Sequence, residues 1–291
     1  MAFVRIEYGG YNLTAANELN GLTCYAVGSG TVLHHIESYY GKDDGFEFFG
    51  GTVNASYLLA VANDDDQFDF DFGYTGKITF GLAIMDPFAT HSTSSGASDS
   101  NAMEVDNDGT GTYATPFTRP VLENFTVIGN PKAGINNASG VTLLYGIKLR
   151  RNTQFSLKNS IITGYPRALQ LENSAALDLD SLVSGSTTQK QIQLTNNLFQ
   201  GFTSASFDKV TNANKSLAAY GVNKTYVDAT NANANIAFTQ PFFTRPAAFN
   251  GVTKTFTLAK IAPTSGTVYF GAFPTTAAVT AWDLANWARL R

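Results

Sequence analysis

Carboxylate side chains recur at a fixed interval near the start of this chain, and carboxylates are the groups that bind a hard cation. The segments "DDGFEFFGGTVN" (43–54) and "DDQFDFDFGYTGK" (65–77) begin 22 residues apart, and each places acidic residues among phenylalanines. Ca²⁺ is bound by about six to eight oxygen atoms, more than one short turn supplies. A Ca²⁺ site is therefore expected if the fold brings the two copies side by side.

Six short segments alternate apolar and polar residues, which is the pattern of a β-strand with one buried face. In each segment two apolar residues face inward, and the residues that follow each of them face outward. The inward pairs begin at Leu22, Phe46, Phe68, Met103, Ile147 and Leu169. The intervals between these positions are 24, 22, 35, 44 and 22 residues, so a period of about 22 is interrupted twice.

A period of about 22 residues with short strands and polar turns is typical of a parallel β-solenoid, whose stacked coils share one core. A second set of apolar segments, from "TVLHHIES" to "IQLTNNLFQG", supplies the remaining strands. A leucine-rich repeat would need an L-x-x-L-x-L framework that is absent, and an antiparallel sandwich would not produce these columns. Because parallel crossovers are almost always right-handed, we predict an all-β, right-handed parallel β-helix.

The β-helix is expected to form one domain over residues 1–291, with regular coils over 1–205 and irregular coils with a C-terminal cap over 206–291. Because "MAFVRIEYGG" enters a strand pattern at once, we expect a fragment of a longer protein. Residues 86–101 and 107–118 interrupt the period and are predicted to be loops. Tyr113 and Phe117 in the second loop could bind sugar rings, or could pack on the wall of the solenoid.

Stacking of the coils at about 4.8 Å would align the outward residues into two columns. The first column contains Glu47, Asp69, Glu104 and Lys148, and the second contains Asp71, Asp106 and Arg150. Like charges at this spacing repel by about 1 kcal/mol per pair even at water-like screening, so a bound cation would stabilise the columns. The predicted Ca²⁺ ligands are Asp65, Asp69, Asp71, Glu104 and Asp106. Other carboxylates in the flanking turns could complete the site, namely Asp43, Asp44, Asp64, Asp66 and Asp108. The alternative is an acidic face that is simply solvated.

Histidine and cysteine suggest no further metal site. His34 and His35 are consecutive in a predicted strand, so their side chains are expected on opposite faces, and His91 lies in a predicted loop. No transition-metal site is therefore expected. Cys24 alternates inward and is expected in the core.

Composition narrows the range of partners. The formal net charge is −4, only 14% of the residues are charged and no basic stripe exists, so nucleic acid is not expected as a partner. No apolar run is long enough to cross a bilayer, so no transmembrane segment is expected. The ends of a solenoid expose unpaired strand backbone, which makes end-to-end self-association a further hypothesis.

Residues 27–84, with "VGSGT", "DDGFEFFGGTVN" and "DDDQFDFDFGYTGK", resemble the repeat block of uncharacterised bacterial β-helix proteins that are common in Bacteroidetes. The late segments "GTVYFGAF" and "AWDLANW" fit the same resemblance. It implies a secreted or cell-surface location and a β-helix fold, but no settled activity. We expect a non-catalytic role in surface structure, adhesion or glycan binding, with Ca²⁺ on the acidic face.

Two other functional classes stay open. A polysaccharide lyase or glycoside hydrolase that acts on an acidic polysaccharide would use the same columns, because inverting hydrolysis needs two carboxyl groups with room for a water. Lys148 and Arg150 could then bind the acidic glycan, or could simply pair with the carboxylates. The Gly-His-Gly motif of polygalacturonases is absent. The second class is a filament or assembly subunit that stacks through its coil ends.

Overall fold

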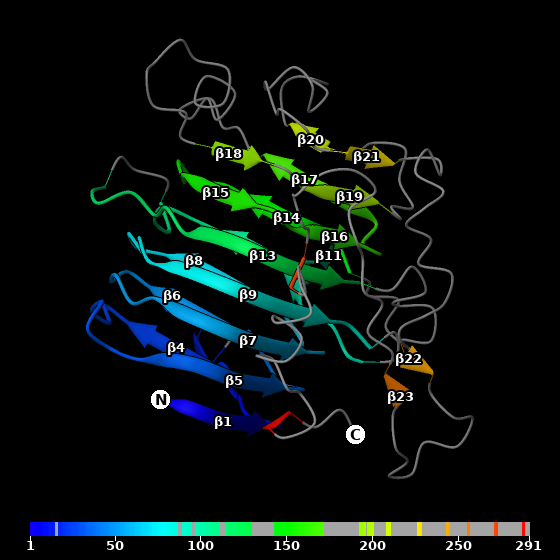
Figure 1. Cartoon of the computed structure of the whole chain (residues 1–291), viewed down its shortest axis with the longest axis horizontal. Helices are drawn as coiled ribbons and strands as arrows, with labels where there is room; N and C mark the ends of the chain where they lie inside the picture. Colours follow the sequence, from blue (N-terminus) through cyan, green and yellow to red (C-terminus); the bar gives the residue numbers. More distant parts are fainter. Residues whose placement is uncertain are drawn as a thin grey trace.

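The computed structural model describes most of the first 171 residues and short segments beyond them. The described residues are 1–14, 17–86, 89–94, 97–110, 114–129, 143–171, 192–195, 197–200, 208–210, 226–228, 243–244, 255–256, 271–272 and 287–288. The strands of the two main sheets stack in chain order, from β1 at the bottom of the view to β21 near the top (Figure 1). All strand pairs in the two main sheets are parallel.

The larger sheet receives one long strand from each early coil and two shorter strands from each later coil. Its strands are β1 (Ala2–Glu7), β5 (Leu33–Tyr39), β7 (Ala55–Val61), β9 (Lys77–Ile84), β13 (Val121–Ile128), β15 (Phe155–Lys158), β16 (Ile161–Thr163), β18 (Ile192–Thr195), β19 (Leu198–Gln200) and β21 (Tyr226–Asp228). In the sheet order β1 is the first strand, and its only partner among the described strands is β5.

The smaller sheet carries the repeated Phe and carboxylate segments. Its strands are β4 (Leu22–Tyr25), β6 (Phe46–Phe49), β8 (Phe68–Asp71), β12 (Met103–Val105), β14 (Tyr145–Leu149), β17 (Arg167–Leu171) and β20 (Asp208–Val210). Three two-stranded antiparallel ribbons complete the described elements. They are β2 (Asn12–Thr14) with β3 (Asn17–Glu18), β10 (Thr93–Ser94) with β11 (Ala97–Ser98), and β22 (Phe243–Thr244) with β23 (Thr255–Phe256).

The register agrees with the period found in the sequence. The six predicted inward positions align across the smaller sheet in the order Leu22, Phe46, Phe68, Met103, Ile147 and Leu169. A shift by one residue would turn every apolar side chain outward, so the alternating pattern specifies this register strongly. The prediction of a parallel β-helix is confirmed.

Aromatic side chains fill the interior as ladders along the stack. The ring of Phe46 stacks on that of Phe68 and the ring of Phe48 on that of Phe70, in each case with 5.4 Å between centroids. The Tyr74 ring lies 5.5 Å from Phe70, and its hydroxyl donates to the Val53 carbonyl oxygen. These rings are buried, so identical residues at equivalent positions of successive coils build a continuous core.

Residues in the left-handed backbone region mark the corners of the coils. Along one corner His35 (φ 53°), Tyr57 (φ 56°), Phe80 (φ 61°) and Asn124 (φ 61°) occupy equivalent positions in β5, β7, β9 and β13. Non-glycine residues rarely adopt this region, and here it bends each strand. The expectation that His34 and His35 lie on opposite faces is therefore wrong, because the bend brings their Nδ1 atoms to 2.9 Å from each other.

The first insertion is more ordered than predicted. Within residues 86–101, the predicted loop, β10 and β11 form a hairpin, and Ser100 pairs in parallel with Leu143. Strands of two residues are too short to show an apolar alternation, so periodicity could not predict them. In the second insertion, Asn107 Oδ1 accepts a hydrogen bond from the Thr118 N–H (2.9 Å). Phe117 is half-buried, and Tyr113 lies outside the described residues.

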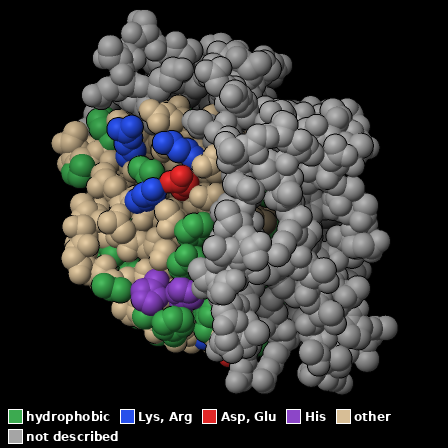
Figure 2. All heavy atoms as spheres, viewed as in Figure 1, with side chains coloured by type: hydrophobic (Ala, Val, Ile, Leu, Met, Phe, Trp, Pro, Cys, Tyr) green, Lys and Arg blue, Asp and Glu red, His purple; other side chains and the backbone are tan. Residues whose placement is uncertain are grey.

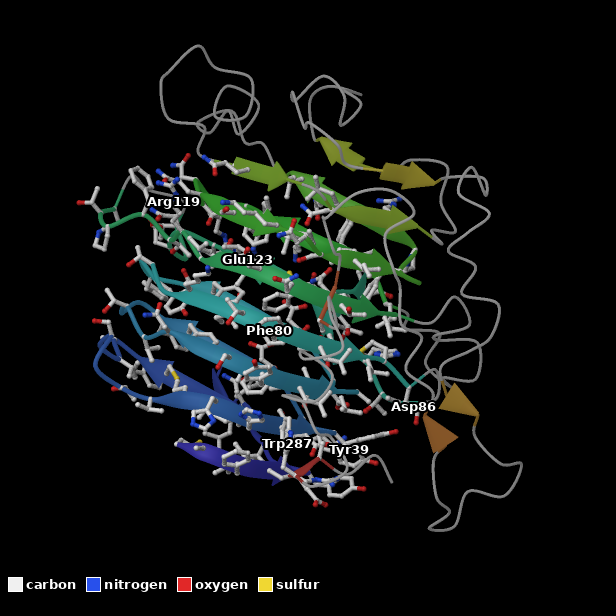
Figure 3. The ribbon with its side chains drawn as sticks, in the orientation of Figure 1. Tyr39, Phe80, Asp86, Arg119, Glu123 and Trp287 are labelled. Carbon is white, nitrogen blue, oxygen red and sulfur yellow. The ribbon has the colours of Figure 1, made fainter. Side chains whose placement is uncertain are left out.

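Most of the predicted C-terminal cap, residues 206–291, lies outside the described residues. The described Gly271 and Ala272 contact the flank of the larger sheet, where their N–H groups donate to Asn159 O (2.7 Å) and Thr126 Oγ1 (2.8 Å). Trp287 lies on the same flank, beside the strands that hold Tyr39 (Figure 3). In the part of the chain that the structure describes, no helix is long and apolar enough to span a bilayer.

Candidate metal centre

Side chains of Asx residues connect the turns that precede the smaller sheet. Asn20 Oδ1 accepts from the Asp44 N–H (3.2 Å), and Asp44 Oδ1 accepts from the Asp66 N–H (2.9 Å). Asp66 Oδ1 accepts from the Asn101 N–H (2.6 Å), and Asn101 Oδ1 accepts from the Tyr145 N–H (3.1 Å). Each coil therefore fixes the turn of the next coil, and the carboxyl groups of Asp44 and Asp66 are held in place.

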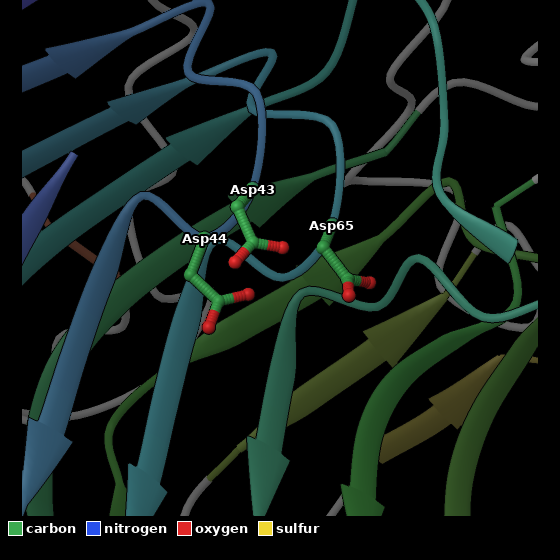
Figure 4. A group of neighbouring side chains, drawn as sticks. All are labelled: Asp43, Asp44 and Asp65. Carbon is green, nitrogen blue, oxygen red and sulfur yellow. The ribbon is translucent and has the colours of Figure 1, made fainter. Parts of the chain in front are cut away.

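Two groups of carboxylates meet at these turns. Asp43, Asp44 and Asp65 form one group, and Asp44, Glu47 and Asp69 form the other. Within each group one oxygen atom per residue lies within 4.8 Å of the others. Because each Ca²⁺–O bond is about 2.3–2.6 Å long, ligands of one Ca²⁺ lie up to about 5 Å apart, so both groups fit this ion. Figure 4 shows Asp43 and Asp44 on one turn and Asp65 on the next turn.

Burial and mutual repulsion make these carboxyl groups hold protons when no cation is bound. Burial is the largest cause, and it raises the pKa of Glu47 and of Asp65 to about 8 and the pKa of Asp43 to about 7. Burial and the Asp69 carboxylate hold the pKa of Asp44 well above its usual range. Neighbouring carboxylates raise all four further. Protons or a metal ion must therefore neutralise the groups.

The next two carboxylates along the stack are neutralised by cationic side chains. Glu104 Oε2 lies 2.7 Å from Lys148 Nζ, and the Glu104 carboxylate also pairs with Arg150. The Asp106 carboxylate lies 2.8 Å from Arg150 Nε and 2.8 Å from Arg151 Nη1. Burial alone would lower the pKa of Lys148, but the Glu104 carboxylate raises it above its usual value. Lys148 is therefore charged at neutral pH and neutralises this end of the column.

The outward face of the smaller sheet thus changes in character along the solenoid. At the early coils the side chains of Tyr25 and Phe72 are 72% and 57% exposed. The ring of Tyr25 stacks on that of Phe49 with 4.9 Å between centroids, and the ring centroid of Phe72 lies 5.7 Å from that of Phe49. Phe49 is in register with Asp71 of the next coil. Apolar rings therefore come first along the face, carboxylates follow and cationic side chains come last.

A comparison with known families agrees with this architecture. The model of the pectate-lyase-like β-helix domain family matches residues 1–243. The chain belongs to this family. No curated protein and no solved structure gives a significant match. The family accounts for the fold, whereas any activity of this pectate-lyase-like β-helix depends on its own outward residues.

The structure brings together only part of the predicted metal-ligand set of this β-helix. Asp65 and Asp69 belong to the carboxylate groups. Asp71 lies outside both groups, and its Oδ1 accepts from the Phe72 N–H (2.6 Å). Glu104 and Asp106 form the ion pairs with Lys148, Arg150 and Arg151 instead.

The residues that complete the two groups are Asp43, Asp44 and Glu47. Asp43 and Asp44 were expected as turn residues that could complete a site, and Glu47 as a member of the first column. A signal for them was present in the sequence. The dipeptide "DD" precedes the inward phenylalanine of two successive coils, at 43–44 and 65–66. Because equivalent positions of successive coils are adjacent, two such turns place four carboxyl groups together.

The raised pKa values predict how stability depends on pH. In calcium-free buffer we expect the melting temperature to fall as the pH rises from about 5 to about 8, and to level off at higher pH. The folded state then holds protons that the unfolded state has lost, and rising pH removes them through the folded-state pKa values of Asp43, Glu47 and Asp65. Each retained proton corresponds to about 1.4 kcal/mol per pH unit, or about 3–5 °C.

Calorimetric melting curves in chelator and in excess Ca²⁺ measure this effect. Ca²⁺ should flatten the pH dependence, because it replaces the protons as the neutralising charge. A melting temperature that is constant or rises with pH in chelator would contradict the proposed protonation of the carboxylate groups.

Proposed function

We propose that this protein is a non-catalytic, secreted or cell-surface bacterial β-helix that binds Ca²⁺ at its acidic turns and a glycan beside them. One contrast carries the proposal. The carboxylates of Glu104 and Asp106 have cationic partners, whereas no salt bridge of the described residues involves the two carboxylate groups around Asp44. Held oxygen atoms without a cationic side chain fit a bound cation.

The exposed aromatic rings support the glycan part of the proposal. Tyr25, Phe49 and Phe72 form an apolar strip, and Phe49 is in register with Asp71, so apolar carbon and carboxylate oxygen lie on one face. A sugar ring has an apolar face and a rim of hydroxyl groups, and both can be satisfied by such a surface. Ca²⁺ at the acidic turns would add a ligand for hydroxyl or carboxylate groups of the glycan.

The family match also suits the alternative of a polysaccharide lyase. A lyase needs a base that removes a proton from the sugar, and Lys148 and Arg150 are the cationic residues that continue the two acidic columns. Lys148 contacts both Asp99 (2.5 Å) and Glu104 (2.7 Å), and Arg150 contacts both Glu104 and Asp106. These contacts stabilise the charged form of each side chain, which disfavours a role as base and favours the non-catalytic function.

Calcium titration of chelator-treated protein, by calorimetry and by thermal melting, tests the metal site. We expect saturable binding, and a melting temperature raised by about 5–10 °C when Ca²⁺ is about 100-fold above its dissociation constant. The double variant Asp43→Asn/Asp65→Asn should lose both effects. Asp64→Asn is the matched control, because Asp64 lies in the same turn but pairs with Lys42 and belongs to neither group.

Equal Ca²⁺ binding by the double variant and the control would refute the site. The glycan arm uses a panel of neutral and acidic polysaccharides with wild type and Tyr25→Ala/Phe72→Ala. Retention that requires both the rings and Ca²⁺ supports glycan binding. Release of unsaturated sugars from an acidic polysaccharide would establish the lyase instead.

A further inference from the structure

We propose that His34 and His35 form a binding site for a divalent transition-metal ion of tetragonal preference, with Cu²⁺ as the favoured ion. The site lies on the larger sheet, and the carboxylate groups lie in the turns before the smaller sheet. It uses nitrogen rather than oxygen ligands, so it is independent of the proposed calcium function.

The local backbone creates the pair. In a regular strand, consecutive side chains point to opposite faces. His35 has a φ of 53°, and this corner turns its ring toward that of His34. The two Nδ1 atoms lie 2.9 Å apart, and the ring planes meet at 87°. One nitrogen donates and the other accepts in the metal-free protein, so at least one imidazole there is neutral.

The separation of the two nitrogen atoms matches a chelate. Metal–imidazole bonds are about 2.0–2.1 Å long, so two nitrogens bound at a right angle lie about 2.9 Å apart. Right angles between neighbouring ligands are the geometry of tetragonal Cu²⁺ and Ni²⁺, whereas tetrahedral Zn²⁺ would need about 3.3 Å. The 2.9 Å separation, which is also the length of the N–H···N hydrogen bond between the rings, already equals that of two neighbouring ligands of Cu²⁺ or Ni²⁺. The donating ring binds the metal as its Nε2–H tautomer, and Cu²⁺ binds imidazole more tightly than Ni²⁺ or Zn²⁺.

Neighbouring aromatic rings hold the histidines in this arrangement. The His35 ring is stacked between Phe3, with 4.6 Å between centroids, and Tyr57, with 4.5 Å. The Phe3 ring also meets the His34 ring edge to face at 5.3 Å. A ligand pair that is already positioned loses little conformational entropy when the metal binds. Figure 2 shows histidine side chains at the surface of this face, with hydrophobic side chains around them.

The pair is accessible to a metal ion and to water. His34 lines an open groove of about 390 Å³, together with Ser56, Lys77 and Thr79 among others. Water in this groove can fill the remaining coordination positions. The nearby Lys77 ammonium is paired with Glu123 at 2.7 Å, which reduces its repulsion of a cation.

The test is a Cu²⁺ titration of the whole 291-residue chain without a histidine tag, in a non-coordinating buffer with excess Ca²⁺. Calorimetry should show one saturable site. Trp287 reports on it, because its ring lies 5.4 Å from that of His35 and bound Cu²⁺ quenches nearby indole fluorescence. Electron paramagnetic resonance should show an axial Cu²⁺ signal with nitrogen coupling. Trp287→Phe should keep the binding heat and lose most of the quenching.

Two variants decide the assignment. His34→Gln removes one ligand from the exposed side of the pair and should weaken Cu²⁺ binding at least tenfold with an unchanged melting temperature. Lys77→Gln lies in the same groove and should bind as wild type does. Absence of saturable binding, or equal affinity and equal nitrogen coupling in His34→Gln and wild type, would overturn the proposal.

Discussion

Replacing Lys148 with Met is expected to lower the free energy of unfolding by about 3 kcal/mol, because removal of one partner of a buried ion pair leaves the other charge buried. Lys148 is buried, and its Nζ contacts Glu104 at 2.7 Å and Asp99 at 2.5 Å. Glu104 keeps Arg150 as a partner, which places the loss at the lower end of the usual range. Urea unfolding followed by circular dichroism measures the change.

The double variant Glu104→Gln/Lys148→Met separates the lost pair from lost packing. Glutamine removes the stranded charge, so most of the stability should return. If Lys148→Met alone unfolds within about 0.5 kcal/mol of wild type, the lysine does not neutralise the acidic column, and the contrast between paired and unpaired carboxylates loses its basis.

The second large effect is expected in the aromatic core. Phe70→Ala should cost about 3–5 kcal/mol, since removal of a buried ring leaves a cavity that close-packed neighbours fill only in part. Phe70 is fully buried. Its ring stacks on those of Phe48 and Tyr74, with 5.4 Å and 5.5 Å between centroids. In a solenoid the loss also weakens the contact of one coil with the next.

Phe72→Ala is the matched control for this prediction, because Phe72 lies two residues further along the chain and is mostly exposed. It should change the free energy of unfolding by no more than about 0.5 kcal/mol. Equal losses for the two variants, measured by urea unfolding, would show that the Phe ladder does not carry the core.

The fold and the alignment of the columns follow from the amino-acid sequence alone. Alternation places Phe46 and Phe48 inward, and the period of about 22 places the next coil's Phe68 and Phe70 on top of them. A parallel solenoid aligns equivalent positions directly, so a one-dimensional repeat becomes a three-dimensional register without any further information. For the same reason the alignment of Glu47, Asp69, Glu104 and Lys148 could be read from their spacing.

The environment of those columns depends on how distant segments pack beside them. The side chain of Glu47 points away from the core and yet Glu47 is only 8% exposed, and Glu104 is buried as well. Both are covered because other segments pack beside this face, namely the turns that carry Asp43 and Asp65 and the first insertion. Alternation distinguishes inward from outward but does not show what covers an outward face. Burial is what turns a row of carboxylates into a site with raised pKa values.

The histidine pair depended on tertiary structure even more strongly. Strand periodicity separates His34 from His35, whereas the left-handed conformation of His35 brings them together. A left-handed non-glycine residue costs about 1–3 kcal/mol and persists only where surrounding contacts enforce it. Those contacts are the rings of Phe3 and Tyr57 in the neighbouring coils, far from His35 in the sequence. Local sequence could not report that conformation, because coil stacking, a non-local interaction, imposes it.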